Sequence, residues 1–203
     1  MALASQQPQQ WYESLQAMST TLDNTIQLTE RLLQLSAVKR KEQGERHFSP
    51  VNLYEVVQTS CFTRLAQARS KGIDLGYEGD QDAVWVEGDE VLLGELCGNL
   101  LDNAIRHTPD GGEVRLKVWR DADRLLAEVQ DSGPGVEEAV REVLFQRPTA
   151  LVPREQRAER GGLGLLIVRR MLELHGGDIS LVSSTAGACF RFSLPLADSP
   201  LSS

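Results

Sequence analysis

Residues 90–109, with the sequence EVLLGELCGNLLDNAIRHTP, decide the fold of this chain. Leucines and an isoleucine recur at three- and four-residue steps, which predicts an amphipathic helix with one face in a hydrophobic core. Glu95, Asn99 and Asn103 follow one another at four-residue spacing, so their side chains lie on nearly one face. Asparagine is unfavourable in a helix interior. We therefore interpret this polar row as a binding site, and the alternative is an ordinary solvated helix face.

The composition is typical of a globular protein, with 203 residues, 41% hydrophobic and 25% charged. A net charge of −8 disfavours a nucleic-acid partner, which usually requires a basic surface. Cys61, Cys97 and Cys189 lack metal-binding spacing, so we expect buried thiols in a reducing compartment. No apolar run approaches the roughly 18 residues of a membrane span, and a signal-peptide pattern is missing. We therefore expect a soluble, cytoplasmic chain.

The first segment predicts one long helix. Residues 11–42 contain neither proline nor glycine, and their apolar side chains recur at helical spacing over about eight turns. This helix has apolar surface to spare and must pack on a partner. We favour a dimerising helical hairpin, because the charged sequence KRKEQGER at residues 39–46 is typical of a linker. The alternative is packing on its own domain.

The remaining pattern mixes strands and helices. Asn52 and Asp89 are placed to cap two helices, and Gly72 is placed to end the first of them. Apolar alternation predicts strands at residues 48–51, 73–77, 83–87, 114–118, 125–130, 179–183 and 189–194. Helices are predicted at residues 53–70, through the central stretch, and at residues 165–175. Residues 137–160 are polar and interrupted by prolines, so we expect a mobile loop with a short helix around Phe145.

Two glycine-rich motifs flank that loop. The sequence DSGPG begins with Asp131 at a strand end, where a carboxylate can accept a hydrogen bond in a pocket while glycines admit a flat ligand. Such turns are common, and an ordinary turn is the alternative. The sequence GGLG at residues 161–164 opens a helix, whose free N–H groups and dipole can bind phosphate. Its spacing excludes the P-loop and the Rossmann fingerprint.

The order of these features resembles the ATP-binding domain of bacterial sensor histidine kinases. The wider family includes gyrase, MutL-type repair ATPases and heat-shock chaperones. The sequence ELCGNLLDNAIRHTPDGG is similar to the kinase N box, DSGPGV to the first glycine box and RGGLGLLIVRRMLELHGG to the second. TAGACFRFSLPL is similar to the end of the domain, so the resemblance covers roughly residues 48–195. NAIRHTP and LHGG favour histidine kinases over the other branches, and residues 11–42 resemble the second helix of the kinase dimerisation domain.

The resemblance implies an α/β (α+β) two-layer sandwich, with a mixed β-sheet, helices on one face and a long preceding helix. Residues 1–46 would be the rest of a helical dimerisation and phosphoacceptor domain with its linker. Residues 47–197 would form the catalytic domain, and residues 198–203 a disordered tail. The implied activity is that of a protein histidine kinase, which transfers the ATP γ-phosphoryl group to a histidine for relay to a response-regulator aspartate. A homodimer anchored in the bacterial inner membrane is also implied for the intact protein.

Site roles follow from the resemblance residue by residue. Asn103 would ligate Mg²⁺ bridging the ATP phosphates, and Asn99 would support those phosphates. Arg106 stands where the family has a cation facing phosphate, and His107 stands beside the nucleotide. Glu95 matches the position that activates water in the related ATPases, and in a kinase it would orient or deprotonate the acceptor histidine.

The glycine boxes would hold the rest of the nucleotide. Asp131 would accept a hydrogen bond from the adenine amino group, while Gly133 and Gly135 would let the ring and the lid approach. The second glycine box would bind ATP through Gly162, Leu163, Gly164 and Leu165, with Gly162 and Gly164 giving backbone contacts to the phosphates.

The chain departs from the family pattern at several positions. The family's F box usually carries two phenylalanines; Phe145 matches the first, and Pro148 stands near the place of the second. Arg160 stands where the second glycine box often begins with glycine. The family's acceptor motif, a histidine followed by Glu or Asp, a short polar run and proline, is missing. None of the three histidines is expected to be the acceptor, and we interpret His175 as a partner of a helix dipole. We therefore expect a fragment that binds ATP without phosphorylating itself.

Three alternatives stay open. One is an ATP-hydrolysing clamp of the gyrase and chaperone branch. Another is a nucleotide-binding or dimerisation module without catalysis. The last is a plain α/β fold without a ligand, which would make every glycine turn a coincidence.

Overall fold

A computed structural model describes residue 18 and residues 48–79, 84–136, 162–184 and 186–197. Within residues 11–42 it describes only Met18, which is helical and exposed. The predictions for the rest of that segment, for the loop at residues 137–160 and for the tail lie outside the described residues.

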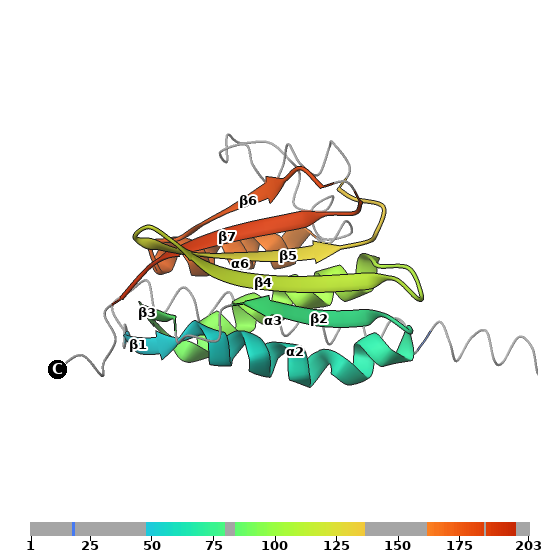
Figure 1. The fold of residues 1–203 in the computed structure, drawn as a ribbon, viewed down its shortest axis with the longest axis horizontal. Coiled ribbons are helices and arrows are strands. Elements are labelled where there is room, and N and C mark those ends of the chain that lie inside the picture. The colour runs from blue at the N-terminus through green and yellow to red at the C-terminus, as the bar shows by residue number, and fades with distance from the viewer. Residues whose placement is uncertain (1–17, 19–47, 80–83, 137–161, 185, 198–203) are drawn as a thin grey trace, which may run out of the picture.

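A five-stranded mixed sheet forms one layer of the fold, in the order β2-β4-β5-β7-β6 (Figure 1). β2 and β4 run parallel, and every other neighbouring pair in this sheet is antiparallel. A small separate sheet pairs β1 with β3. The strand bounds are β1 Ser49–Asn52, β2 Asp74–Gly79, β3 Trp85–Gly88, β4 Glu113–Asp121, β5 Arg124–Asp131, β6 Asp178–Val182 and β7 Cys189–Pro195.

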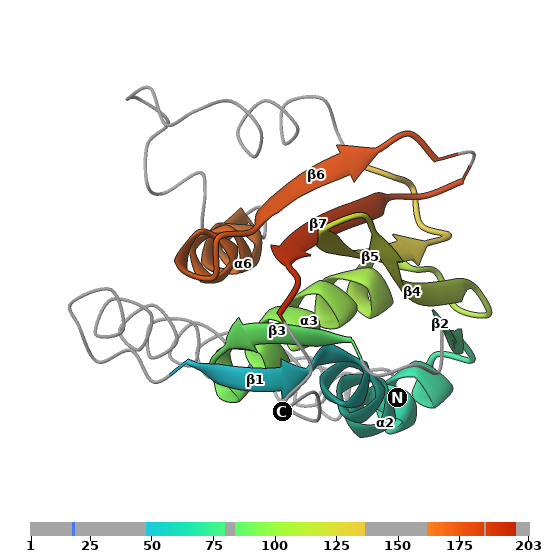
Figure 2. The same ribbon diagram turned by 60° about the vertical axis from the view of Figure 1, so that its left-hand side comes forward.

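The described helices form the second layer. They are α2 (Leu53–Ser70), α3 (Glu90–His107) and α6 (Gly162–Leu174), and Figure 2 shows them on the same side of the sheet. α3 lies between the other two and packs against both. The architecture confirms the predicted two-layer fold. None of the described helices is long and apolar enough to cross a membrane.

Both predicted N-caps are confirmed. The Asn52 side chain accepts a hydrogen bond from the Tyr54 amide at 3.2 Å at the start of α2. Asp89 Oδ1 accepts from the Val91 and Leu92 amides at 3.1 and 3.2 Å at the start of α3. Each cap satisfies backbone donors that have no partner inside the helix, which is why these elements begin where the sequence predicts.

The core lies between the two layers. Alternate side chains of β4 and β5 are buried against the helices, and the intervening ones are more exposed. α3 contributes the largest apolar face, and its Leu93, Leu96 and Leu101 are 0% exposed. The three cysteines are free and buried, as predicted. Burial raises the pKa of Cys61 to about 11 and that of Cys97 to about 12, so both thiols stay protonated and unreactive.

The structure corrects the start of α6. The helix begins at Gly162, whereas the sequence predicts a glycine turn and a start at Leu165. Glycine disfavours helix interiors, and this local preference motivated the prediction. Packing overrides it here, because Gly164 is buried where α6 approaches α3.

Candidate functional site

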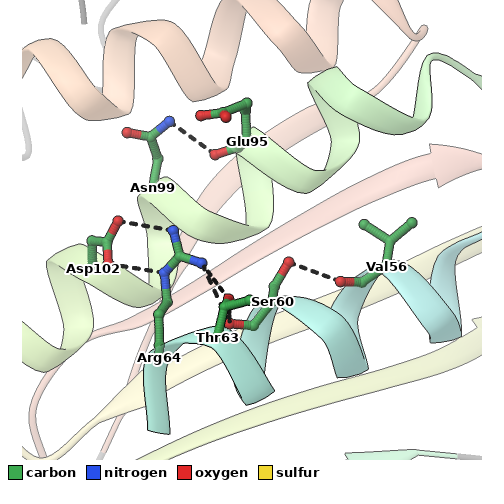
Figure 3. Close-up of polar contacts among 7 residues, drawn as sticks. All are labelled: Val56, Ser60, Thr63, Arg64, Glu95, Asn99 and Asp102. Atoms are coloured by element: carbon green, nitrogen blue, oxygen red, sulfur yellow. Dashed lines mark hydrogen bonds and ion pairs between the residues drawn. The ribbon is translucent and has the colours of Figure 1, made fainter. Parts of the chain in front are cut away.

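The predicted polar row lies on the side of α3 that faces α6. Figure 3 shows the Glu95 and Asn99 side chains on this side, and Asn99 Nδ2 donates to the Glu95 carbonyl oxygen at 2.8 Å. Asn103 follows one turn later and is only 9% exposed. Within the described residues, the Asn103 side-chain amide makes no hydrogen bond. The amide keeps some accessible surface, so its oxygen and nitrogen are available to a ligand or a metal ion.

The second glycine box meets this row directly. A methyl group on Gly164 would lie 3.6 Å from Asn103 Nδ2 and 3.8 Å from Asn99 Oδ1. The first turn of α6 therefore lies beside both amides, although residues 103 and 164 are far apart in sequence. Gly162 and Leu163 belong to the same first turn, and Leu165 is half-buried. This arrangement joins a helix N-terminus, which attracts anions, to two amides.

Asp131 is the buried carboxylate of the site, at the end of β5 and 6% exposed. Its Oδ1 accepts from the amides of Gly133 at 2.8 Å and Ala188 at 3.2 Å. Its Oδ2 takes part in none of the hydrogen bonds of the described chain. The carboxylate is thus held firmly through one oxygen, and the other can accept from a ligand.

Glycines surround that carboxylate at close range. A methyl group on Gly133 would lie 2.6 Å from the His107 carbonyl oxygen and 2.9 Å from Asp131 Oδ1. Gly135 has a φ of +83°, which favours glycine. Gly187 has a φ of +68°, and a side-chain carbon there would overlap the Asp131 carbonyl oxygen. The first glycine box and the end of α3 are therefore in contact.

Sequence reasoning missed the part of the site that comes from the β6–β7 turn. Ala188 donates to Asp131 Oδ1, and its carbonyl accepts from the Asp131 amide at 2.9 Å. The sequence alone assigns TAGACF to the end of the resembled domain, with a strand from residue 189, and gives it no role in the site. The glycine between the two strands is the available sign of a close approach, but Asp131, the partner of Ala188, is 57 residues away.

Arg106 and His107 lie at the end of α3, and both are exposed. Lys71, at the end of α2, donates from Nζ to the carbonyl oxygens of Ile105 at 2.8 Å, Arg106 at 3.2 Å and Thr108 at 2.6 Å. Although the residue is exposed overall, neighbouring atoms partly desolvate the imidazole and lower the pKa of His107. The Arg106 and Lys71 charges lower this pKa further, and the Asp131 charge opposes them. The imidazole is therefore neutral at pH 7.

Metal binding by protein side chains alone has no support in the described chain. No group of three or more His, Cys, Asp or Glu side chains that could hold a metal occurs there. A Mg²⁺ ion at Asn103 would thus take most of its oxygen ligands from phosphates and water, as this ion commonly does.

Comparison with known proteins identifies the domain. Residues 88–198 match the family model described as histidine kinase-, DNA gyrase B-, and HSP90-like ATPase. The chain belongs to this family. The match spans more than half of the chain and includes the N box and both glycine boxes.

Individual relatives place it among the histidine kinases. The sensor protein kinase PmrB of Pseudomonas aeruginosa is 34% identical over 187 residues, covering 92% of this chain and 38% of PmrB. The nucleotide-free catalytic domain of the histidine kinase ThkA superposes with a TM-score of 0.64 at 27% identity, covering 74% of this chain and 98% of that domain. These relatives confirm the predicted histidine kinase catalytic domain and its fold.

A further solved structure is similar to this chain. It contains ThkA in complex with the response regulator protein TrrA, with a TM-score of 0.62 at 26% identity. It covers 87% of this chain and 52% of the ThkA chain. The chain spans well under half the length of PmrB and about half that of this ThkA chain.

Proposed function

We propose that this histidine kinase-type domain binds Mg²⁺·ATP between α3 and α6 and supplies the γ-phosphoryl group to a histidine on a dimerisation helix. The phosphoryl group then passes to an aspartate of a response regulator. The observation that carries the proposal is the meeting of Gly164 with Asn99 and Asn103. It places the helix N-terminus of the second glycine box against the amides of the N box.

The described residues fit each part of the nucleotide. Asp131 Oδ2 is available for the donor on the adenine amino group, and the neighbouring glycines let the backbone pack closely around that carboxylate. Gly162, Leu163, Gly164 and Leu165 form the first turn of α6, where backbone N–H groups suit phosphate. Asn103 would hold Mg²⁺, which neutralises phosphate charge when bound.

The chemistry needs little from the protein beyond positioning and charge neutralisation. Asn99 and Arg106 hold the phosphates, and His107 lies against the nucleotide. The acceptor nitrogen bonds to the γ-phosphorus while the bond to the bridging oxygen breaks and ADP leaves. Glu95 orients the acceptor imidazole or takes its proton, since this carboxylate shares one face of α3 with the two amides.

The test supplies the acceptor in trans, as the dimerisation helices of a relative such as PmrB, together with ATP labelled in its γ-phosphate. We expect acid-labile label on a histidine, lost in Asn103→Ala. Glu95→Gln should lower the transfer rate by roughly 10²–10⁴-fold, the range of general acid–base catalysis, and leave ATP affinity intact.

Two outcomes would contradict the proposal. Steady phosphate release at the same rate with and without the acceptor would identify an ATP-hydrolysing clamp. Nucleotide binding without any label on the acceptor histidine would identify a binding module without catalysis, and an unchanged transfer rate in Glu95→Gln would remove Glu95 from the chemistry.

A further inference from the structure

Arg64 and Asp102 form an ion pair that joins α2 to α3 (Figure 3). Arg64 Nε donates to Asp102 Oδ1 at 2.8 Å, and Nη2 donates to Oδ2 at 3.0 Å. Nη1 donates to Thr63 Oγ1 at 3.2 Å and to the Ser60 carbonyl oxygen at 3.4 Å. The guanidinium therefore has two parallel bonds to α3 and two more to its own helix. This two-pronged geometry is more specific than a single contact.

Gly98 gives the same guanidinium a second contact on α3. A side-chain carbon at Gly98 would overlap Arg64 Nη2 and lie 3.0 Å from its Cζ. Gly98 is buried, and it precedes Asp102 by four residues, about one helical turn. Arg64 in this position lies directly against the Gly98 backbone, so a side chain there would displace the guanidinium. It contacts the helix at two points along one row.

That row lies immediately beside the nucleotide-facing row. Gly98 precedes Asn99 in the sequence, and Asp102 precedes Asn103, so the rows differ by about 100° around the helix axis. A helix held at two points along one row cannot turn about its axis without breaking the ion pair. The direction of the neighbouring amides is therefore fixed by the contact with α2.

We propose that Arg64 is a positioning residue for the phosphates and the metal ion. By holding Gly98 and Asp102 against α2, it directs the amides of Asn99 and Asn103 toward Gly164. It also neutralises Asp102, a carboxylate that stands next to Asn103 and would otherwise repel phosphate. The inference rests on the proposed function, but its geometric part concerns the free domain and can be tested without nucleotide.

The variants are Arg64→Met, Arg64→Lys and Gly98→Ala. The matched control is Arg191→Met, which removes an arginine pairing with Glu128 at 2.7 Å between β7 and β5. Two signals are measured in each protein. One is the NMR resonances of the Asn99 and Asn103 side-chain amides in the free domain. The other is the Mg²⁺ concentration that gives half-maximal binding of a non-hydrolysable ATP analogue.

We expect Arg64→Met and Gly98→Ala to shift both amide resonances and to raise the half-maximal Mg²⁺ concentration by about tenfold or more, the effect of losing one charge-assisted contact. Arg64→Lys should recover part of this loss, because it keeps the charge but not the paired bonds. Arg191→Met should change neither signal, even where it lowers thermal stability. A purely structural ion pair would affect stability alone.

The experiment distinguishes failure of the positioning role from failure of the proposed function. Amide resonances and Mg²⁺ dependence in Arg64→Met that match those of Arg191→Met would overturn the positioning role and leave the proposed function standing. A wild-type domain that binds no nucleotide, while Arg64→Met still shifts the amides, would overturn the proposed function and confine Arg64 to orienting α3.

Discussion

The backbone amide of Asp89 donates to Nε2 of His175 at 3.1 Å, which joins the start of α3 to the end of α6. This bond needs an unprotonated Nε2, so the ring proton is on Nδ1, 2.6 Å from the Met171 carbonyl oxygen. The ring also stacks on Phe48, with centroids 4.7 Å apart and planes inclined by 8°. His175 is therefore a neutral, buried side chain that joins α3 to α6. At the C-terminal end of α6, its Nδ1–H donates one hydrogen bond to the Met171 carbonyl oxygen.

This arrangement predicts a dependence of stability on pH. Burial lowers the pKa of His175 below its usual 6.5 despite the opposing effects of Met171 and Asp89. The unfolded chain then binds the proton more readily, so the contribution of His175 is complete above about pH 6.5 and is lost as the pH falls toward the folded pKa.

Urea unfolding of His175→Gln measures this contribution. Both proteins should carry His107→Gln, because the pKa of His107 is lowered in the same direction. We expect a loss of about 1–3 kcal/mol in the free energy of unfolding at pH 7.5, since two hydrogen bonds of a buried side chain are disturbed. The difference in unfolding free energy between the two proteins should narrow below pH 6.5. A gap that stays constant down to pH 5 would contradict the neutral, buried ring.

Asp131 is predicted to select the base. Its Oδ2 suits the amino group of adenine, whereas guanine presents a carbonyl at the same ring position. Asp131→Asn can keep the bonds from Gly133 and Ala188 and turn an amide NH₂ toward the ligand. We expect the ratio of ATP to GTP affinity, measured by calorimetry, to fall by about tenfold or more. Asp178→Asn, an exposed change on β6, should leave the ratio unaltered, and an unaltered ratio in Asp131→Asn would place adenine elsewhere.

Gly187 and Gly111 offer a matched test of close packing. Both have positive φ, at +68° and +77°. A side chain at Gly187 would overlap the Asp131 carbonyl, whereas nothing lies within 4 Å at Gly111. Gly111→Ala should cost only the backbone preference, about 1 kcal/mol, while Gly187→Ala should cost roughly 2–4 kcal/mol and weaken nucleotide binding. Equal losses of unfolding free energy would argue against the tight turn under Asp131.

Lys71 holds the C-terminal end of α3 through three carbonyl oxygens. Lys71→Met removes all three bonds and a favourable charge at a helix C-terminus, so we expect a loss of about 1–3 kcal/mol in unfolding free energy. The pKa of His107 should rise, because Lys71 lowers it. Arg69→Met changes the same net charge at an exposed position and is the control. An NMR titration that finds the His107 pKa unmoved in Lys71→Met would contradict this contact.

The parts of the fold that depend on neighbouring residues could be predicted from the sequence. Asn52 and Asp89 cap helices through bonds to residues two or three positions away, and strand alternation is equally local. The start of α6 could not be predicted, because the packing of Gly164 against α3 joins residues that are far apart in the sequence.

The site follows the same division. The N box and the glycine boxes were recognisable as motifs in the sequence. Arg64, Lys71 and Ala188 were not, because their partners lie 38, 34 to 37 and 57 residues away, and no local pattern marks them. Such contacts depend on how the elements pack, which periodicity alone does not determine.

The most direct measurement is a calorimetric titration of the domain with a non-hydrolysable ATP analogue, with Mg²⁺ present and with Mg²⁺ chelated. The wild type and Gln58→Ala, an exposed change on α2, should bind more tightly with Mg²⁺. Asn103→Ala should lose most of that gain while keeping metal-free affinity, because Asn103 is the proposed Mg²⁺ ligand. Equal affinity with and without Mg²⁺ in the wild type, or an Asn103→Ala protein that keeps the full gain, would contradict a nucleotide–metal site between α3 and α6.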